Sequence, residues 1–288
     1  MSALVLGATG NIGPHVVHEL IALGQTPRVV VRDADKAHTL FGDAVEVIAG
    51  DMSDPAVLDT ATDGVDSVFL LSPHSFGMAN VQLGVIRELR RSGIRIVKLS
   101  GTSSAITPDG PHVCRQHWEI ERVLQESGQP FVILRPNSFM QVLVGQLMLG
   151  QLRATGSIIN AIGQAGISLI DARDVGAVAA QVLTRHDWDG QTLELTGPRA
   201  VTYPQLSKLV GVYEPAPVVD AAPAQVRASL LQRGVPGWEA EHFLEMYELF
   251  AAGESAFVTD TLEQVTGRPP RTIEAFLAET LEQAGVAS

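Results

Sequence analysis

The sequence has little cysteine, lysine or basic charge. Cys114 is its single cysteine, which excludes an internal disulfide and a cysteine-based zinc site. Lysine occurs only at Lys36, Lys98 and Lys208, and 20 lysines and arginines stand against 32 aspartates and glutamates, for a formal net charge of −12. Nucleic acids and anionic membranes are bound through basic surfaces, so this charge balance argues against both as main partners.

Long apolar runs are also lacking. No stretch approaches the ~18 consecutive apolar residues of a membrane span, and the opening MSALVLGATG has neither the basic flank nor the apolar run of a signal peptide. A content of 45% hydrophobic and 18% charged residues excludes the disordered and fibrous classes. We therefore expect a soluble, cytoplasmic globular protein. Its expected partner is a small-molecule substrate, and a monomer and a homodimer are both left open.

Histidines do not supply a metal site either. His15 and His18 lie three positions apart in a predicted helix, but no third ligand accompanies them. His112 and His117, with Cys114 between them, are five positions apart and would not share one helical face. No metal is expected.

The first half of the chain alternates short apolar runs with helical patterns. The runs are nearly continuous in apolar character, as in strands buried on both faces of a parallel sheet. They are Ala3–Leu6, Arg28–Val31, Val45–Ala49, Ser67–Leu71, Ile94–Leu99 and Phe131–Leu134. The helical segments between them are Asn11–Leu23, Pro55–Ala61, Gly77–Ser92 and His112–Ser127. This order predicts an α/β protein with a Rossmann-like, doubly wound parallel sheet.

The second half is less regular. We expect Gly163–Ile170 and Val175–Thr184 as one more strand and helix of the sheet, with Asp174 as the helix N-cap. Thr192–Thr196 is predicted to be a short strand, and a proline-rich loop between Tyr213 and Ala224 precedes the helices Trp238–Ala252 and Thr272–Ala284. Residues 1–136 and about 166–185 are assigned to the Rossmann domain. Residues from about 137–165 and 186–288 are assigned to a smaller C-terminal substrate lobe.

The most informative motif is Gly7-Ala-Thr-Gly10-Asn-Ile-Gly13, between the first strand and the first helix. Glycines at this spacing permit a tight turn and a close approach of the backbone to a pyrophosphate. The N-terminus of the helix then presents free N–H groups and a positive dipole end. The motif predicts a dinucleotide site, with a simple tight turn as the alternative. Its contacts are expected from Gly7, Thr9, Gly10, Asn11, Ile12 and Gly13.

The residues after the second strand indicate which dinucleotide binds. NAD-binding proteins place an acidic residue ~20 positions beyond the loop, whereas an arginine accommodates the 2′-phosphate of NADP. Arg32 follows the second strand and Lys36 lies one turn later, so NADPH is preferred over NADH. Ordinary surface charges are the alternative. The remaining cofactor contacts are expected from Asp51 and Met52 near the adenine, and from Leu71, Ser72 and Pro73 toward the nicotinamide.

Several segments, taken in order, resemble one family. They are GATGNIG (7–13), VVVRDADK (29–36), AGDMSD (49–54), LLSP (70–73), HWEIERVLQESG (117–128), FVILRPNSFM (131–140), DARDVGAV (171–178) and TGRPPRTIEAFL (266–277). The chain is thereby similar to the NmrA-like, atypical short-chain dehydrogenase/reductase family. The resemblance implies this fold. It also implies either an NADPH-dependent quinone, azo-dye or triphenylmethane reductase, or a dinucleotide-binding redox sensor.

The catalytic Tyr-x-x-x-Lys pair of ordinary short-chain dehydrogenases is absent. Tyr203, Tyr213 and Tyr247 all lie late in the chain, and none is followed by a lysine four positions on. Tyrosinate-driven ketone reduction is therefore not expected. His117 lies in the helix where the pair should be and is the candidate acid/base, because imidazole titrates near neutrality. A packing or capping histidine is the alternative.

Other candidates follow the predicted strands at the carboxyl edge, where open α/β sheets bind ligands. The substrate pocket is expected to include His74, Phe76, Ser100, Asn137 and Phe139. For His74 the alternative is a surface loop, and for the segment 135–139 it is a hinge into the second lobe.

These observations predict an NADPH-dependent oxidoreductase that transfers hydride to a quinone-like or other conjugated acceptor. Such an acceptor delocalises the charge that develops, so the missing Tyr-Lys pair is tolerable, and the cofactor supplies the chemistry. The alternative is an NADP-binding, redox-sensing regulatory protein without turnover.

Overall fold

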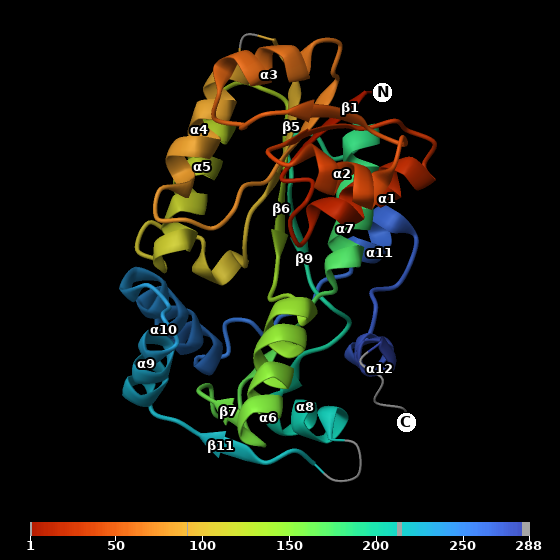
Figure 1. Cartoon of the computed structure of the whole chain (residues 1–288). Helices are drawn as coiled ribbons and strands as arrows, with labels where there is room; N and C mark the ends of the chain where they lie inside the picture. The colour runs from red at the N-terminus through yellow and green to blue at the C-terminus, as the bar shows by residue number, and fades with distance from the viewer. Residues whose placement is uncertain (1, 91, 212–214, 284–288) are drawn as a thin grey trace.

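A seven-stranded parallel sheet forms the centre of the computed structural model, which describes residues 2–90, 92–211 and 215–283 (Figure 1). The strand order is β3-β2-β1-β4-β5-β6-β9, which reverses between β1 and β4 as in doubly wound folds. The strands are β1 (Ala3–Leu6), β2 (Arg28–Val31), β3 (Glu46–Ala49), β4 (Ser67–Leu70), β5 (Arg95–Leu99), β6 (Phe131–Pro136) and β9 (Thr192–Leu195). The predicted fold class is confirmed.

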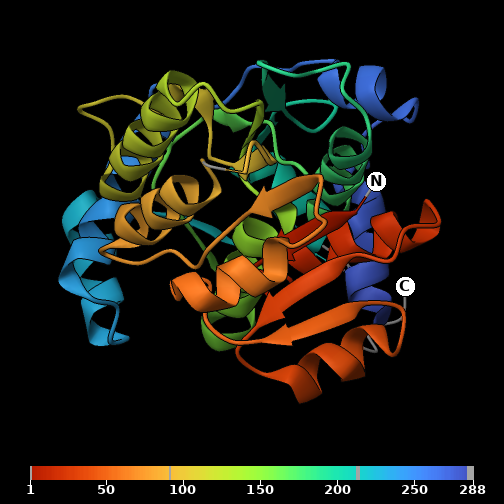
Figure 2. The ribbon, with the colours of Figure 1, turned by 90° about the horizontal axis from the view of Figure 1, so that it is seen from above.

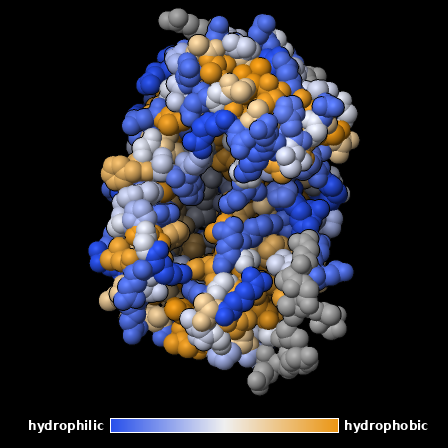
Figure 3. Space-filling view, in the orientation of Figure 1, coloured by the Kyte–Doolittle hydropathy of each residue, from blue (hydrophilic) through white to orange (hydrophobic). Residues whose placement is uncertain are grey.

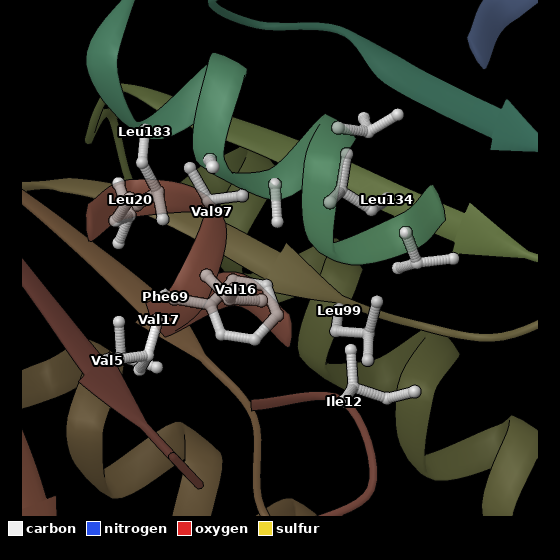
Figure 4. Close-up of a cluster of buried hydrophobic side chains, with 14 of the residues drawn as sticks. Val5, Ile12, Val16, Val17, Leu20, Phe69, Val97, Leu99, Leu134 and Leu183 are labelled. Carbon is white, nitrogen blue, oxygen red and sulfur yellow. The ribbon is translucent and has the colours of Figure 1, made fainter. Parts of the chain in front are cut away.

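Helices cover both faces of this sheet (Figures 1 and 2). One face carries α1 (Gly13–Ala22), α2 (Ala34–Phe41) and α7 (Ala172–Thr184), and the other carries α3 (Pro55–Thr62), α4 (Met78–Leu89) and α5 (His112–Glu126). Alternate strand residues enter opposite layers: Val5 packs toward α1 and α7, while Leu4 and Leu6 pack toward α3 to α5. Figure 4 shows the first of these clusters, with Phe69 and Val97 between the sheet and the helices.

The smaller lobe lies below the carboxyl ends of the strands in Figure 1. A π-helical segment, Gln141–Met148, leads into it from β6, and its core is formed by side chains such as Val144, Tyr203 and Phe276. Its elements are α6 (Leu149–Thr155), β7 (Ile158–Asn160), β8 (Gly166–Ile167), β10 (Val201–Thr202), α8 (Tyr203–Val210), β11 (Val218–Asp220), α9 (Pro223–Gln232), α10 (Gly237–Ala251) and α12 (Ile273–Gln283). The short helix α11 (Thr261–Thr266) returns to pack beside α7 in the sheet domain.

The structure corrects several predictions for the second half. Gly163–Ile170 is not a strand of the central sheet, because only Gly166–Ile167 is extended and it pairs antiparallel with Val201–Thr202. Thr192–Leu195, which the sequence division placed in the lobe, is the seventh strand and pairs parallel with β6. The predicted loop before Ala224 contains β11, which lies beside β7; residues 212–214 lie outside the described part.

The N-cap of α7 is also different from the prediction. Asp171 caps the helix, since its carboxylate accepts a hydrogen bond from the backbone N–H of Arg173 at 2.8 Å. Asp174 instead forms an ion pair with Arg271, from the segment that precedes α12. The two aspartates therefore stabilise the helix and its connection to the C-terminal segment.

Candidate active site

The glycine motif forms a tight loop at the carboxyl end of β1. Gly7 has a φ of 74°, and a Cβ there would lie 2.8 Å from the carbonyl oxygen of Leu71. A Cβ on Gly13 would lie 2.2 Å from the carbonyl oxygen of Gly7. Neither position has room for a larger residue, so the glycines hold the loop folded back on itself.

The first turn of α1 is suited to an anion. No side chain caps this N-terminus, and no acidic residue lies in its first turn. Gly10 is exposed, and a Cβ there would approach only the carbonyl oxygen of Gly7, at 3.4 Å. The positive end of the helix dipole therefore faces an open space of the kind that a pyrophosphate fills.

The predicted cations lie beside this loop. The Lys36 ammonium donates a hydrogen bond to the carbonyl of Thr9 at 3.1 Å, and Arg32 is exposed directly after β2. The carboxylate of Asp33 is turned away into the N-cap of α2, where it accepts from the Lys36 backbone N–H at 2.9 Å. Asp33 thus caps α2 through Oδ1, while the exposed Arg32 beside it is the group suited to a 2′-phosphate.

The other predicted cofactor contacts lie around the loop. Hydrogen bonds from the Ser53 side chain and backbone lower the pKa of Asp51, which lies near Arg32. Met52 packs against the apolar layer beneath α3, and Ile12 is buried in the opposite layer. An Ile12 contact to a dinucleotide would therefore come from its backbone.

The segment after β4 connects the loop with the centre of the site. The Leu71 carbonyl touches the loop at Gly7, and Pro73 is exposed. The Ser72 hydroxyl is buried and accepts from the Gln82 amide on α4 at 2.8 Å. This hydrogen bond fixes the segment that leads to His74.

His117 lies against a buried lysine that sequence reasoning did not single out. The Nδ1 atom of His117 is 3.0 Å from Nζ of Lys98, and both side chains are at most 5% exposed. Burial lowers the pKa of Lys98 to about 7. Burial, and then Lys98 and two neighbouring histidines, hold the pKa of His117 well below its ordinary value. The imidazole is therefore neutral at neutral pH.

A carboxylate network lies one turn further along α5. Glu121, nearly fully buried, accepts hydrogen bonds from the Ser100 hydroxyl and from Nη2 of Arg135 at 2.5 Å. Arg135 comes from β6 and Ser100 from the end of β5. The network joins the strand ends to the helix that carries His117.

His74 lies beside the His117 ring, and an aromatic cluster lies at the start of α5. His74 is exposed, and its ring lies edge-on to that of His117 at 6.2 Å between centroids. Phe76 is 65% exposed and stacks on His112 at 4.7 Å, with Trp238 from α10 at its edge. In the space-filling view, a hollow opens between the sheet domain and the lobe (Figure 3).

The side chains of two predicted pocket residues make contacts inside the protein. The Asn137 side chain is buried, donates to the Ser255 carbonyl at 2.9 Å and accepts from the Ser255 hydroxyl at 2.8 Å. Phe139 packs partly buried against the layer of α1 and α7 and bridges to Ile170. These contacts fix the connection between β6 and the smaller lobe.

Two site residues were missed by sequence reasoning. Lys98 carried a usable signal, since it is a charged residue inside an otherwise apolar strand of a chain with three lysines. His242 of α10 carried none. It is 7% exposed, its Nδ1 has no partner among the described residues, and burial lowers its pKa to about 4.

The fold and the loop define a dinucleotide-binding α/β protein, and comparisons with known proteins specify it further. The NmrA-like family model matches residues 2–277, so the chain belongs to the NmrA-like family. It is 34% identical to the NAD(P)H azoreductase of Xenophilus azovorans over 95% of this chain and 96% of that protein. It is 31% identical to (4-alkanoyl-5-oxo-2,5-dihydrofuran-3-yl)methyl phosphate reductase of Streptomyces griseus, over 97% and 98%.

A solved structure is also similar. The NADPH-dependent quinone oxidoreductase of Escherichia coli, complexed with NADPH, has a TM-score of 0.86 and 25% identity, over 97% of this chain and 99% of that one. Within residues 2–90, 92–211 and 215–283, no helix is long and apolar enough to cross a membrane. The same residues contain no group of three histidine, cysteine or acidic side chains arranged to hold a metal ion.

Proposed function

We propose that the protein is an NADPH-dependent reductase that transfers hydride to a quinone-like or other conjugated small-molecule acceptor, with His117 as proton donor. One observation carries this proposal. The short segment 71–74 touches the glycine loop at Gly7 and, three residues on, the imidazole of His117. A dinucleotide anchored at the loop and extended along this segment would bring its reactive ring to the buried histidine.

The chain's own residues fit NADPH. The loop and the first turn of α1 would hold the pyrophosphate, and Arg32 with Lys36 would hold the 2′-phosphate. When bound, the cofactor supplies the hydride. The names of the similar proteins describe NAD(P)H-dependent reduction of azo compounds and quinones, which supports the same cofactor and reaction class here.

The chemistry of the site favours an acceptor that needs no tyrosinate. Tyr203 is 2% exposed within the core of the smaller lobe, and Tyr247 packs against the same cluster, so neither serves the site; Tyr213 lies outside the described residues. A conjugated acceptor spreads the charge that arrives with the hydride and requires only one proton afterwards. The exposed ring of Phe76 offers a face on which a flat acceptor can stack.

His117 is suited to supply that proton. Because Lys98 lies at Nδ1, the Nε2 atom is the side of the ring left for the acceptor. The neutral imidazole donates from Nε2 to the oxygen or nitrogen that becomes anionic after hydride transfer. His117 is only 5% exposed, so a bound acceptor would cover the ring and keep water from competing until the product leaves.

The direct test is oxidation of NADPH by the purified protein in the presence of quinone, azo-dye and unsaturated-ketone acceptors. We expect turnover with at least one acceptor, and weaker activity with NADH. Tight NADPH binding without oxidation by any acceptor would contradict the proposal and would favour a redox-sensing protein that binds dinucleotide without turnover.

A further inference from the structure

Lys98 is an unusual side chain for the middle of a sheet. It lies on β5 with 0% exposure, among residues such as Ile96 and Ile133 that form the apolar layer beneath α4 and α5. Burying an ammonium group costs free energy unless a partner compensates it. A lysine kept in such a place needs a partner or a function.

Lys98 forms no ion pair with any residue that the structure describes. Its Nζ atom donates to the carbonyl of Leu99 and lies 3.0 Å from Nδ1 of His117. The nearby carboxylate of Glu121 is held by Arg135 and Ser100 instead. The lysine is therefore aimed at an imidazole, which fixes the hydrogen-bonding state of that ring.

The contact selects one tautomer of His117. An ammonium group has only donors, so Nδ1 must be unprotonated to accept from it. The single proton of the neutral ring then resides on Nε2, the atom assigned above to the acceptor. The hydrogen bond made by one ring nitrogen of a histidine commonly determines the protonation of the other nitrogen in this way.

We propose that Lys98 is a positioning and proton-supplying residue, which holds His117 as the Nε2–H tautomer and returns a proton to Nδ1 when Nε2 protonates the reduced acceptor. This inference rests on the proposed reductase function. The inference adds to that function a residue, Lys98, that does not touch the acceptor and acts only through His117.

The proton balance of the step is complete. The hydride carries both electrons from the cofactor to the acceptor, which becomes an anion. The Nε2–H bond of His117 breaks and a bond from that proton to the acceptor forms, while one N–H bond of Lys98 breaks and Nδ1 gains the proton. Lys98 is then a neutral amine. After product release it takes back the Nδ1 proton, and Nε2 regains one from water in the open site.

The groups around the pair set the expected pH dependence. His117 and Glu121 face Lys98 from α5, and Glu121 is paired with Arg135 of β6, while His74 and His242 face the His117 ring from the segment after β4 and from α10. Since burial lowers the pKa of Lys98 to about 7, Lys98 carries the proton to be transferred below that pH and has lost it above that pH. The rate of the chemical step should therefore be level below about pH 7 and should fall above it.

The first experiment measures the tautomer directly and requires no turnover. Nitrogen-15 NMR of histidine-labelled protein at pH 6, where Lys98 is mostly protonated, should show His117 as Nε2–H in the wild type and as a tautomer mixture in Lys98→Met. Lys208→Met, which removes an exposed lysine of α8, is the control and should leave the signal unchanged. A proton on Nδ1 in the wild type, or an unchanged tautomer in Lys98→Met, would overturn the inference.

The second experiment measures the relay in single-turnover reduction of a quinone. Lys98→Met should lower the rate about tenfold with NADPH affinity unchanged, and should remove the alkaline fall. Lys98→Arg keeps a cation at Nδ1 that does not release its proton, so it should restore the tautomer but not the pH profile. An alkaline fall that persists in both variants would contradict the relay.

If neither variant folds, the wild-type tautomer and pH profile decide alone. If the wild type oxidises no NADPH, the function fails while the tautomer still tests the positioning role.

Discussion

The glycine loop and the histidine–lysine cluster, for which we propose cofactor binding and proton donation, lie at the same edge of the sheet but are built in opposite ways. The loop is one contiguous segment, 7–13, whose shape is set by glycine backbone and which leads into the uncapped N-terminus of α1. The cluster consists of side chains from four separate segments: His74, Lys98, His117 and His242. The loop is therefore defined by its backbone shape, whereas the cluster is a set of interacting titratable side chains.

This difference predicts which property a substitution will change. A side chain added to the loop acts by steric exclusion and should reduce binding. A side chain removed from the cluster should alter rates and pH dependence while the dinucleotide still binds. The following variants, in order of decreasing effect, test that separation.

The largest effect is expected from Gly10→Val. The new side chain would occupy the open space above the first turn of α1, where the pyrophosphate is expected. NADPH affinity, measured by calorimetry, should fall by more than about 100-fold, or about 2.7 kcal/mol, with the fold intact by circular dichroism. Gly150→Val in α6 is the control, because a Cβ there meets nothing within 4 Å. Unchanged NADPH affinity in Gly10→Val would show that the loop does not bind the dinucleotide.

His117→Ala tests the cluster. It should lower kcat by about 100-fold while NADPH affinity stays nearly constant, because the proton donor is lost and the loop is not. His186→Ala, on the surface beside Asp189, is the control. Because the pKa of His117 lies well below 6.5, its own ionisation should produce no break in the neutral range. A loss of less than about fivefold would mean that the acceptor anion takes its proton from water.

Arg32→Asp tests the cofactor preference. A carboxylate would replace a cation beside the 2′-phosphate, so NADPH binding should weaken far more than NADH binding, with a change in ratio of about tenfold or more. Arg153→Asp, at the exposed end of α6, controls for the change in net charge. Equal losses for both dinucleotides would show that Arg32 has only a structural role.

The smallest effect is expected from Phe76→Ala. Loss of the exposed ring that stacks on His112 should raise KM for a flat quinone by about fivefold, in line with the ~1 kcal/mol of an aromatic pair. The value of kcat should change little, since the ring binds and does not react. Leu23→Ala removes an exposed apolar side chain at the far end of α1 and should leave KM unchanged. An unchanged KM in Phe76→Ala would place the acceptor elsewhere.

The same contrast explains how far the sequence could be interpreted. The first six strands, the glycine loop and the NmrA-like family were predicted correctly, because buried parallel strands and glycine turns leave contiguous patterns. Thr192–Leu195 was wrongly assigned to the lobe, because the pattern of a short strand does not show which strand it pairs with. Lys98 and His242 were missed because the cluster exists only after folding joins β5, α5 and α10.

The central claim is that a dinucleotide held at the loop delivers hydride beside His117. The most direct measurement mixes protein preloaded with NADPH, or with NADPH carrying deuterium at the transferred position, with a quinone and follows a single turnover. The bound cofactor should be oxidised, with a primary isotope effect on the rate. Bound NADPH that stays reduced through the whole acceptor series would contradict it.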